Sequence, residues 1–118
     1  MPLELRSRIT LLLPAPTTLP QHFLVEGILT GLAEVCGGVT VSSDVPPVFT
    51  GSWIRNDGRK VDDTNLLVLA DAPMAPDDPD LLAYLKRLKL CSQHAFNQDL
   101  VWVTVHEVHR IIAYDPAF

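Results

Sequence analysis

The apolar residues of this chain follow two different periods, and each period predicts a different kind of element. Residues 8–13 form a short apolar run that ends at a proline, which is typical of a buried strand. Residues 100–105 place valine at every second position, which predicts a strand that continues through residues 107–112. Residues 66–69 are apolar on both faces, so we expect the strand over residues 60–70 to lie in the middle of a sheet.

The first helix is predicted by its end signals and by one apolar stripe. Thr18 is a good N-cap, Gln21 stands three residues later as its reciprocal partner, and Gly37 with the next glycine provides a stop. The stripe comprises Leu24, Ile28, Leu32 and Val35. Gly27 and Gly31 are expected to let this helix lie close to a sheet.

A β-hairpin and a second helix follow. The turn Asn56-Asp57-Gly58 joins strands predicted over residues 48–55 and 60–70, because Asp-Gly between two β-rich runs is a strong hairpin signal. Residues 71–79 read as a linker, and Asp78 before Pro79 is expected to cap the second helix. The buried side of that helix is expected to consist of Leu81, Leu82, Leu85 and Leu88.

The predicted order of elements is β-α-β-β-α-β within 118 residues. That order predicts one domain over residues 1–118 with an α+β fold of the ferredoxin-like type, a four-stranded antiparallel sheet with two helices on one face. The fold name implies no iron–sulfur cluster. The alternative is a smaller α+β layout in which residues 39–47 form an extra strand.

Composition and charge narrow the classes of function. The formal net charge is −5, and the nine basic residues are scattered along the chain, which argues against a nucleic acid or an anionic membrane surface as the partner. The apolar run near the N-terminus is too short for a signal peptide, and no run is long enough to cross a membrane, so we expect a cytoplasmic protein. Cys36 and Cys91 are too few for a zinc or iron–sulfur site; we expect two buried free thiols, with a Cys36–Cys91 disulfide as the alternative.

Several short motifs between residues 35 and 105 resemble a known family. They are Gly37-Gly38-Val39-Thr40, Gly51-Ser52-Trp53, Asp57-Gly58 followed by Asp62-Asp63, Leu66–Leu69, and Phe96-Asn97-Gln98. Together they are similar to uncharacterised small bacterial proteins with G-x-T, G-x-W, D-G and F-x-Q-(E/D) segments. The resemblance supports the same fold and implies no activity. Many members look like secreted lipoproteins with a lipid-bearing cysteine near the N-terminus. This chain has no such cysteine, which favours a cytoplasmic relative, and Asp99 stands where the family usually has glutamate.

The histidine pair His106 and His109 is the first place to consider for a metal. On a helix two residues three apart share a face, but on a strand they point to opposite faces. Because we expect them at the end of a strand, and because the HExxH spacing is absent, the sequence predicts no metal site.

The two tryptophans are expected on strands. Trp102 alternates with Val101 and Val103, so we expect the valines to face the helices and Trp102 to face the other side of the sheet. An exposed apolar sheet face is more often a dimer interface than a catalytic floor.

We therefore expect a small cytoplasmic interaction module that forms a homo-oligomer through its sheet face, with no cofactor and no visible catalytic motif. One alternative is a cofactor-free enzyme or small-ligand-binding protein whose pocket lies between sheet and helices or inside a dimeric barrel. The candidate residues for such a pocket are Trp53, Arg55, His94, Gln98 and Trp102. A second alternative is a module that docks another partner on the Trp102 face.

Overall fold

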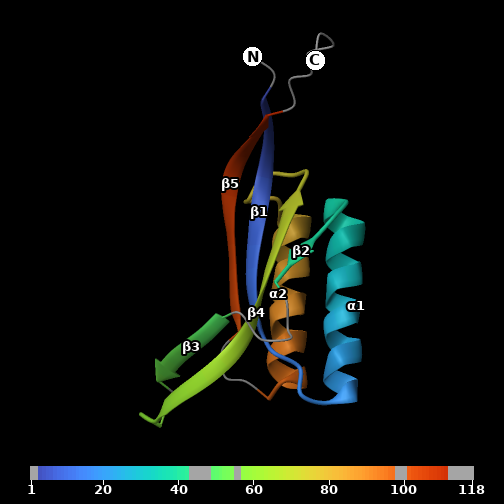
Figure 1. Ribbon diagram of the computed structural model, residues 1–118. Coiled ribbons are helices and arrows are strands. Elements are labelled where there is room, and N and C mark those ends of the chain that lie inside the picture. The colour runs from blue at the N-terminus through green and yellow to red at the C-terminus, as the bar shows by residue number, and fades with distance from the viewer. Residues whose placement is uncertain (1–2, 43–48, 55–56, 98–100, 112–118) are drawn as a thin grey trace, which may run out of the picture.

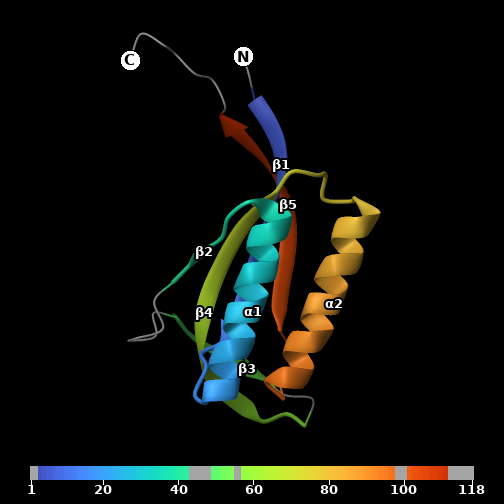
Figure 2. The same cartoon turned by 90° about the vertical axis from the view of Figure 1, so that its right-hand side faces the viewer.

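An antiparallel sheet carries two helices on one face (Figure 1). The computed structural model describes residues 3–42, 49–54, 57–97 and 101–111. In chain order the elements are β1 (Leu3–Pro14), α1 (Leu19–Cys36), β2 (Thr40–Val41), β3 (Phe49–Ile54), β4 (Lys60–Ala72), α2 (Pro79–Ala95) and β5 (Trp102–Ile111). The two helices lie side by side over the sheet (Figure 2). The fold is therefore α+β, with both helices on one side.

The strands run in the order β2-β4-β1-β5, and β3 also pairs with β4. Asn65 of β4 pairs with Pro14 of β1 on one edge and with Phe49 of β3 on the other. Farther along the edge that Phe49 uses, Thr40 of β2 pairs with Leu69. Because β2 and β3 use the same edge of β4, together they occupy one outer position, and the sheet is four positions wide. The extra strand of the alternative layout thus exists at residues 40–41 but does not widen the sheet.

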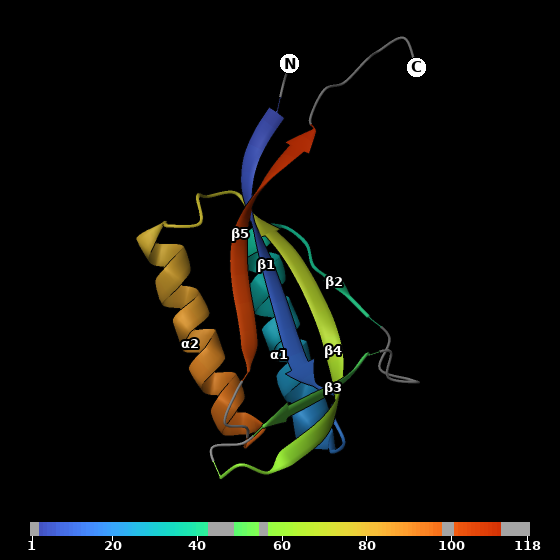
Figure 3. The ribbon, with the colours of Figure 1, turned by 90° about the vertical axis from the view of Figure 1, so that its left-hand side faces the viewer.

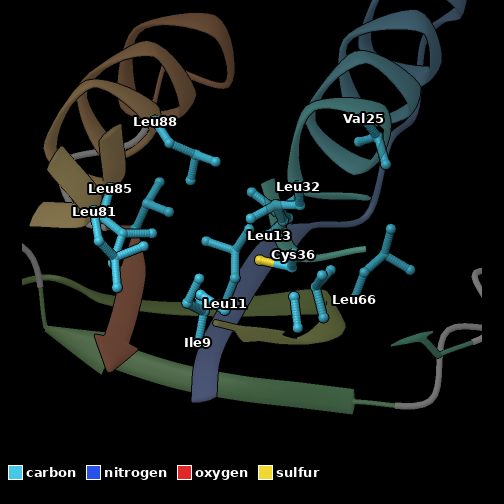
Figure 4. Close-up of a cluster of buried hydrophobic side chains, with 14 of the residues drawn as sticks. Ile9, Leu11, Leu13, Val25, Leu32, Cys36, Leu66, Leu81, Leu85 and Leu88 are labelled. Carbon is cyan, nitrogen blue, oxygen red and sulfur yellow. The ribbon is translucent and has the colours of Figure 1, made fainter. Parts of the chain in front are cut away.

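Alternation along β1 sorts its side chains between the two faces. Ile9, Leu11 and Leu13 are at most 1% exposed, whereas Thr10 and Leu12 between them are half-buried. The buried set packs with apolar residues of β4 and of both helices into one cluster (Figure 4). This cluster is the core of the domain, and it lies between the sheet and the helices.

Both helices begin at the residues that the sequence predicts. The Thr18 hydroxyl accepts a hydrogen bond from the Gln21 amide, and the Asp78 carboxylate accepts one from the Leu81 amide at 3.0 Å. The expected reciprocal bond is absent, because the Gln21 side chain accepts from the backbone and hydroxyl of Thr17 instead. The caps therefore fix where each helix starts.

The buried sides of the helices differ in part from the prediction. On α1, Val25, Leu32 and Cys36 are buried, and the predicted residues Leu24, Ile28 and Val35 pack at the margin of the core. On α2, Leu82 is 44% exposed, so it does not belong to the buried stripe; Ser92 does.

Gly31 lies close to the other helix and not, as the sequence predicts, close to the sheet. A Cβ on Gly31 would lie 3.1 Å from the hydroxyl of Tyr84 on α2, whereas one on Gly27 would meet no atom within 4 Å. The small residue at position 31 therefore lets the two helices approach each other, and neither glycine is needed for contact with the sheet.

The strands β1 and β4 are both longer than their apolar runs predict. β1 begins at Leu3 because it pairs with β5 along its whole outer part, from Leu3 opposite Ile111 onward. β4 continues to Ala72, two residues into the predicted linker, because β1 pairs with it there. At the end near both termini, β1 and β5 project as a two-stranded ribbon (Figure 1).

Candidate functional site

The sheet face opposite the helices, which faces the viewer in Figure 3, carries three cross-strand rows of residues. The strand registers define each row across β5, β1 and β4. The rows are Trp102–Leu12–Leu67, then Thr104–Thr10–Leu69, then His106–Arg8–Asp71. The face therefore changes along the strands from apolar, through a mixed row, to charged.

Trp102 is the most exposed apolar residue in these rows. It is 53% exposed, while its cross-strand partner Leu12 and the next residue in the row, Leu67, are half-buried. Val101 on the other face is only 2% exposed, and Val103 and Val105 pack against the core. The predicted sorting of Trp102 and the valines between the two faces is confirmed.

A second candidate site lies where the C-terminal end of α1 meets the ends of β1, β4 and β5. It is a cleft of about 540 Å³. Its lining comprises Arg6, Arg8, Cys36, Gly37, Gly38, Val39, Thr40, Leu69, Ala70, Asp71 and Arg110. Three of the chain's nine basic residues thus line one cleft of a protein whose formal net charge is −5.

Arg6 forms hydrogen bonds to three of the segments around this cleft. Only 8% of its surface is exposed. Its guanidinium donates to the backbone carbonyls of Cys36 at 3.3 Å and Asp71 at 2.7 Å, and to the Glu4 carboxylate at 2.8 Å. A cation at the end of α1 also suits the partial negative charge of a helix C-terminus. Arg6 therefore fixes the end of α1 against the end of β4.

Arg8 and Arg110 are the more accessible cations of the cleft. The Nε and Nη2 atoms of Arg8 donate to the two carboxylate oxygens of Asp71 at 2.8 and 3.0 Å. Arg110, whose side chain is 58% exposed, lies 3.8 Å from Glu4. Three arginines with two carboxylates leave the cluster with one net positive charge.

The charges around Asp71 affect the pKa of its carboxyl group. Hydrogen bonds from Arg8 hold the pKa of Asp71 below its ordinary value; partial burial opposes this shift, and the charges of Arg8, Arg6 and Arg110 add to it. The pKa of Cys36 is raised, because burial disfavours its thiolate more than the nearby Arg6 favours it. Asp71 is therefore charged at neutral pH, and Cys36 is a thiol.

The structure does not bring the five residues expected to line a ligand pocket together among the residues that it describes. His94 is exposed in the last turn of α2, on the helix side, whereas Trp102 lies on the other face of the sheet. Trp53 pairs with Val61 through the β3–β4 ladder, and its side chain is outside the described part. Arg55 and Gln98 also lie outside the described residues.

The histidines and cysteines hold no metal cluster within the described part of the chain. His106 and His109 lie on β5 at positions of opposite parity, opposite Arg8 and Leu5 respectively, and both are exposed. No group of three metal-ligating side chains occurs among the residues that the structure describes. Cys36 is buried as expected, but Cys91 is exposed on α2, so the prediction of two buried thiols is wrong for Cys91.

Sequence reasoning did not find the arginine cleft. Arg6 and Arg8 are two residues apart, but Asp71 and Arg110 are distant in the chain and become neighbours only through the pairing of β1 with β4 and β5. The one available signal was the pair of arginines two residues apart, at the same parity, at the start of the predicted first strand.

Comparison with known proteins adds no relative. No protein-family model, curated protein or solved structure matches this chain. Neither of the two described helices has the length and apolar character needed to cross a membrane.

Proposed function

We propose that this chain is an interaction module that self-associates through the helix-free face of its sheet. The observation that carries the proposal is the 53% exposure of Trp102 beside Leu12 in the apolar row. Large aromatic residues are enriched at the centres of protein interfaces and cost free energy when they stay in water. A second copy of the chain is the occupant we propose, because two identical faces pair through a twofold axis.

The projecting ribbon of β1 and β5 also exposes apolar side chains, but they have the strand parity of Leu11 and Val103 on the helix side, so they do not add to the case for the helix-free face. Leu3, Leu5 and Ile111 on this ribbon are 47%, 44% and 73% exposed. A two-stranded ribbon is at best marginally stable in water unless its apolar side chains pack against something. A partner chain that covers the ribbon would stabilise it.

The sheet order supports the finer fold assignment that we propose, the ferredoxin-like arrangement. β4 and β1 are central, β5 is at one edge, and β2 with β3 is at the other. We also propose a cytoplasmic location. Cys36 and Cys91 are unpaired, and free thiols fit a reducing compartment. The acidic net charge supports the absence of a nucleic-acid partner.

Light scattering coupled to size-exclusion chromatography tests the self-association. We expect the wild type to be a dimer with a dissociation constant of about 1 μM or tighter. Trp102→Lys should weaken the dimer by about thirtyfold or more, because it replaces the most exposed apolar residue of the three rows with a charge. The control is Leu90→Lys, which replaces a 60% exposed leucine on α2 and should leave the dimer intact.

Two results would contradict the proposal. One is a wild type that stays monomeric at about 100 μM, since that concentration exceeds the expected dissociation constant by about two decades. The other is a dimer that Trp102→Lys leaves unchanged. The alternative of a ligand-binding protein gains support from a different place, the arginine cleft.

A further inference from the structure

The arginine cleft contains one buried donor that the protein itself does not satisfy. Arg6 lines the cleft, its side chain is 10% exposed, and its Nε atom has no hydrogen-bond partner among the described residues. Buried polar groups in proteins are nearly always paired, and an unpaired one at a cleft calls for an explanation. Because this Nε atom is itself enclosed by the protein, a ligand does not reach it in this conformation, and the accessible donors of the cleft are those of Arg8 and Arg110.

Gly38 is a second, independent feature of the same cleft. Unlike Gly37, whose φ is +84°, it does not adopt a conformation that favours glycine. A Cβ on Gly38 would meet no atom within 4 Å, so packing does not require glycine either. Because Gly38 has no side chain, the cleft keeps open space beside it.

We infer that this cleft binds a small organic anion. Arg8 presents the guanidinium nitrogen Nη1, which its pair with Asp71 does not use, and Arg110 is 58% exposed. A guanidinium is a planar fork of donors that matches the oxygens of a carboxylate or a phosphate. The single net positive charge of the cluster suits one such group.

The remaining lining residues indicate which chemical group the rest of the ligand carries. Val39, Leu69 and Ala70 line the cleft together with the two glycines. The volume of about 540 Å³ lies within the range of roughly 300–1,000 Å³ for small-molecule sites, and a lone inorganic ion would leave most of it unfilled. We therefore expect an anionic group joined to an apolar body.

Protein NMR with four probes tests this site. The probes are phenyl phosphate, benzoate, inorganic phosphate and benzyl alcohol, titrated at constant ionic strength into the ¹⁵N-labelled full chain. We expect phenyl phosphate or benzoate to bind with a dissociation constant of about 1 mM or tighter and to shift the amide signals of Gly38, Thr40 and Asp71. The stronger of the two identifies the anionic group as phosphate or carboxylate.

Two variants with matched controls show whether the cleft is the site. Gly38→Leu fills the open space and should weaken binding at least tenfold, while Gly27→Leu, also at a glycine with open space, should leave it unchanged. Arg8→Gln should weaken binding at least tenfold, while Arg87→Gln on α2 removes the same charge outside the cleft and should not. If Gly38→Leu loses its dispersed spectrum, Arg8→Gln decides the test.

Four results would overturn the inference. The first is the absence of shifts at the cleft amides up to about 10 mM of either aromatic anion. The second is equal binding of benzyl alcohol, which has no charge, and the third is equal binding of inorganic phosphate, which has no apolar body. The fourth is undiminished binding by Arg8→Gln.

Discussion

Arg8 of β1 and Asp71 of β4 stand opposite each other across the strand pair and form a two-bonded ion pair of 2.8 and 3.0 Å. The pair closes the charged row of the helix-free face and borders the cleft. Because both side chains keep 31–41% of their surface exposed, water screens the pair, and its stabilising effect is modest.

Asp71→Asn should lower the free energy of unfolding at pH 7 by about 0.5–1 kcal/mol. The pKa of Asp71 is lowered in the folded state relative to about 3.9 in the unfolded chain, so its contribution is complete above that value and is lost as the pH falls through the folded pKa. Urea unfolding of wild type and variant between pH 7 and pH 2 measures the difference. It should shrink towards zero in acid.

The control for this pair is Asp57→Asn in the Asp57–Arg59 pair, which is longer at 3.8 Å and more exposed. It should change the stability little at any pH. A stability difference for Asp71→Asn that stays constant or grows in acid would contradict the assigned ion pair.

Leu11 and Leu12 are neighbours on opposite faces of β1, and their truncation should have unequal effects. Leu11 is fully buried, so Leu11→Ala should cost about 2–5 kcal/mol of unfolding free energy. Leu12→Ala, on the half-buried face, should cost clearly less in the monomer. Chemical denaturation of both variants measures this; equal losses would mean that the two faces are equally covered.

Gly37 and Gly38 form a second matched pair. Gly37 caps α1 with φ +84°, so Gly37→Ala should cost about 1–2 kcal/mol through backbone strain alone, since the new Cβ meets no atom. Gly38→Ala carries no such strain and should be neutral or slightly stabilising. Thermal unfolding of the two variants gives the comparison, and a larger loss at position 38 would show that the cap is misplaced.

The two cysteines should differ in reactivity. Cys91 is exposed, whereas Cys36 is buried and its pKa is raised by that burial. A thiol reagent at pH 8 should label Cys91 long before it labels Cys36. The thiolate is the reactive form, and burial disfavours the thiolate of Cys36. Mass spectrometry of digested protein identifies the labelled residue, and Cys91→Ser serves as the control. Rapid labelling of Cys36 in that variant would mean that the end of α1 opens readily.

Much of the fold could be predicted because its signals are local. Thr18 and Asp78 supply acceptors for helix amides, and the alternation of Val101, Trp102 and Val103 decides which side of the sheet each occupies. The lengths of β1 and β4 could not be read from their apolar runs, since residues 3–7 and 71–72 become strand by pairing with a neighbour. The family resemblance stays a prediction, as no family model matches.

The candidate pocket residues come from two separate stretches, residues 53–55 and 94–102, and their grouping into one pocket remains a prediction. His94 and Trp102 are only eight residues apart, yet they belong to different sides of the sheet, because the chain passes from the α2 layer into β5 between them. Short sequence distance does not bring two side chains to one site when a change of layer separates them.

The sequence by itself determined the kind and order of the elements apart from the short strand β2, the caps of both helices and the side of the sheet that carries Trp102. Those features depend on interactions between residues only a few positions apart, so the local order of residues is enough to predict them. Only the tertiary structure decided that Arg6, Arg8, Asp71 and Arg110 line one cleft. Their meeting depends on the register of β1 against β4 and β5, and that register follows from the packing of the whole core.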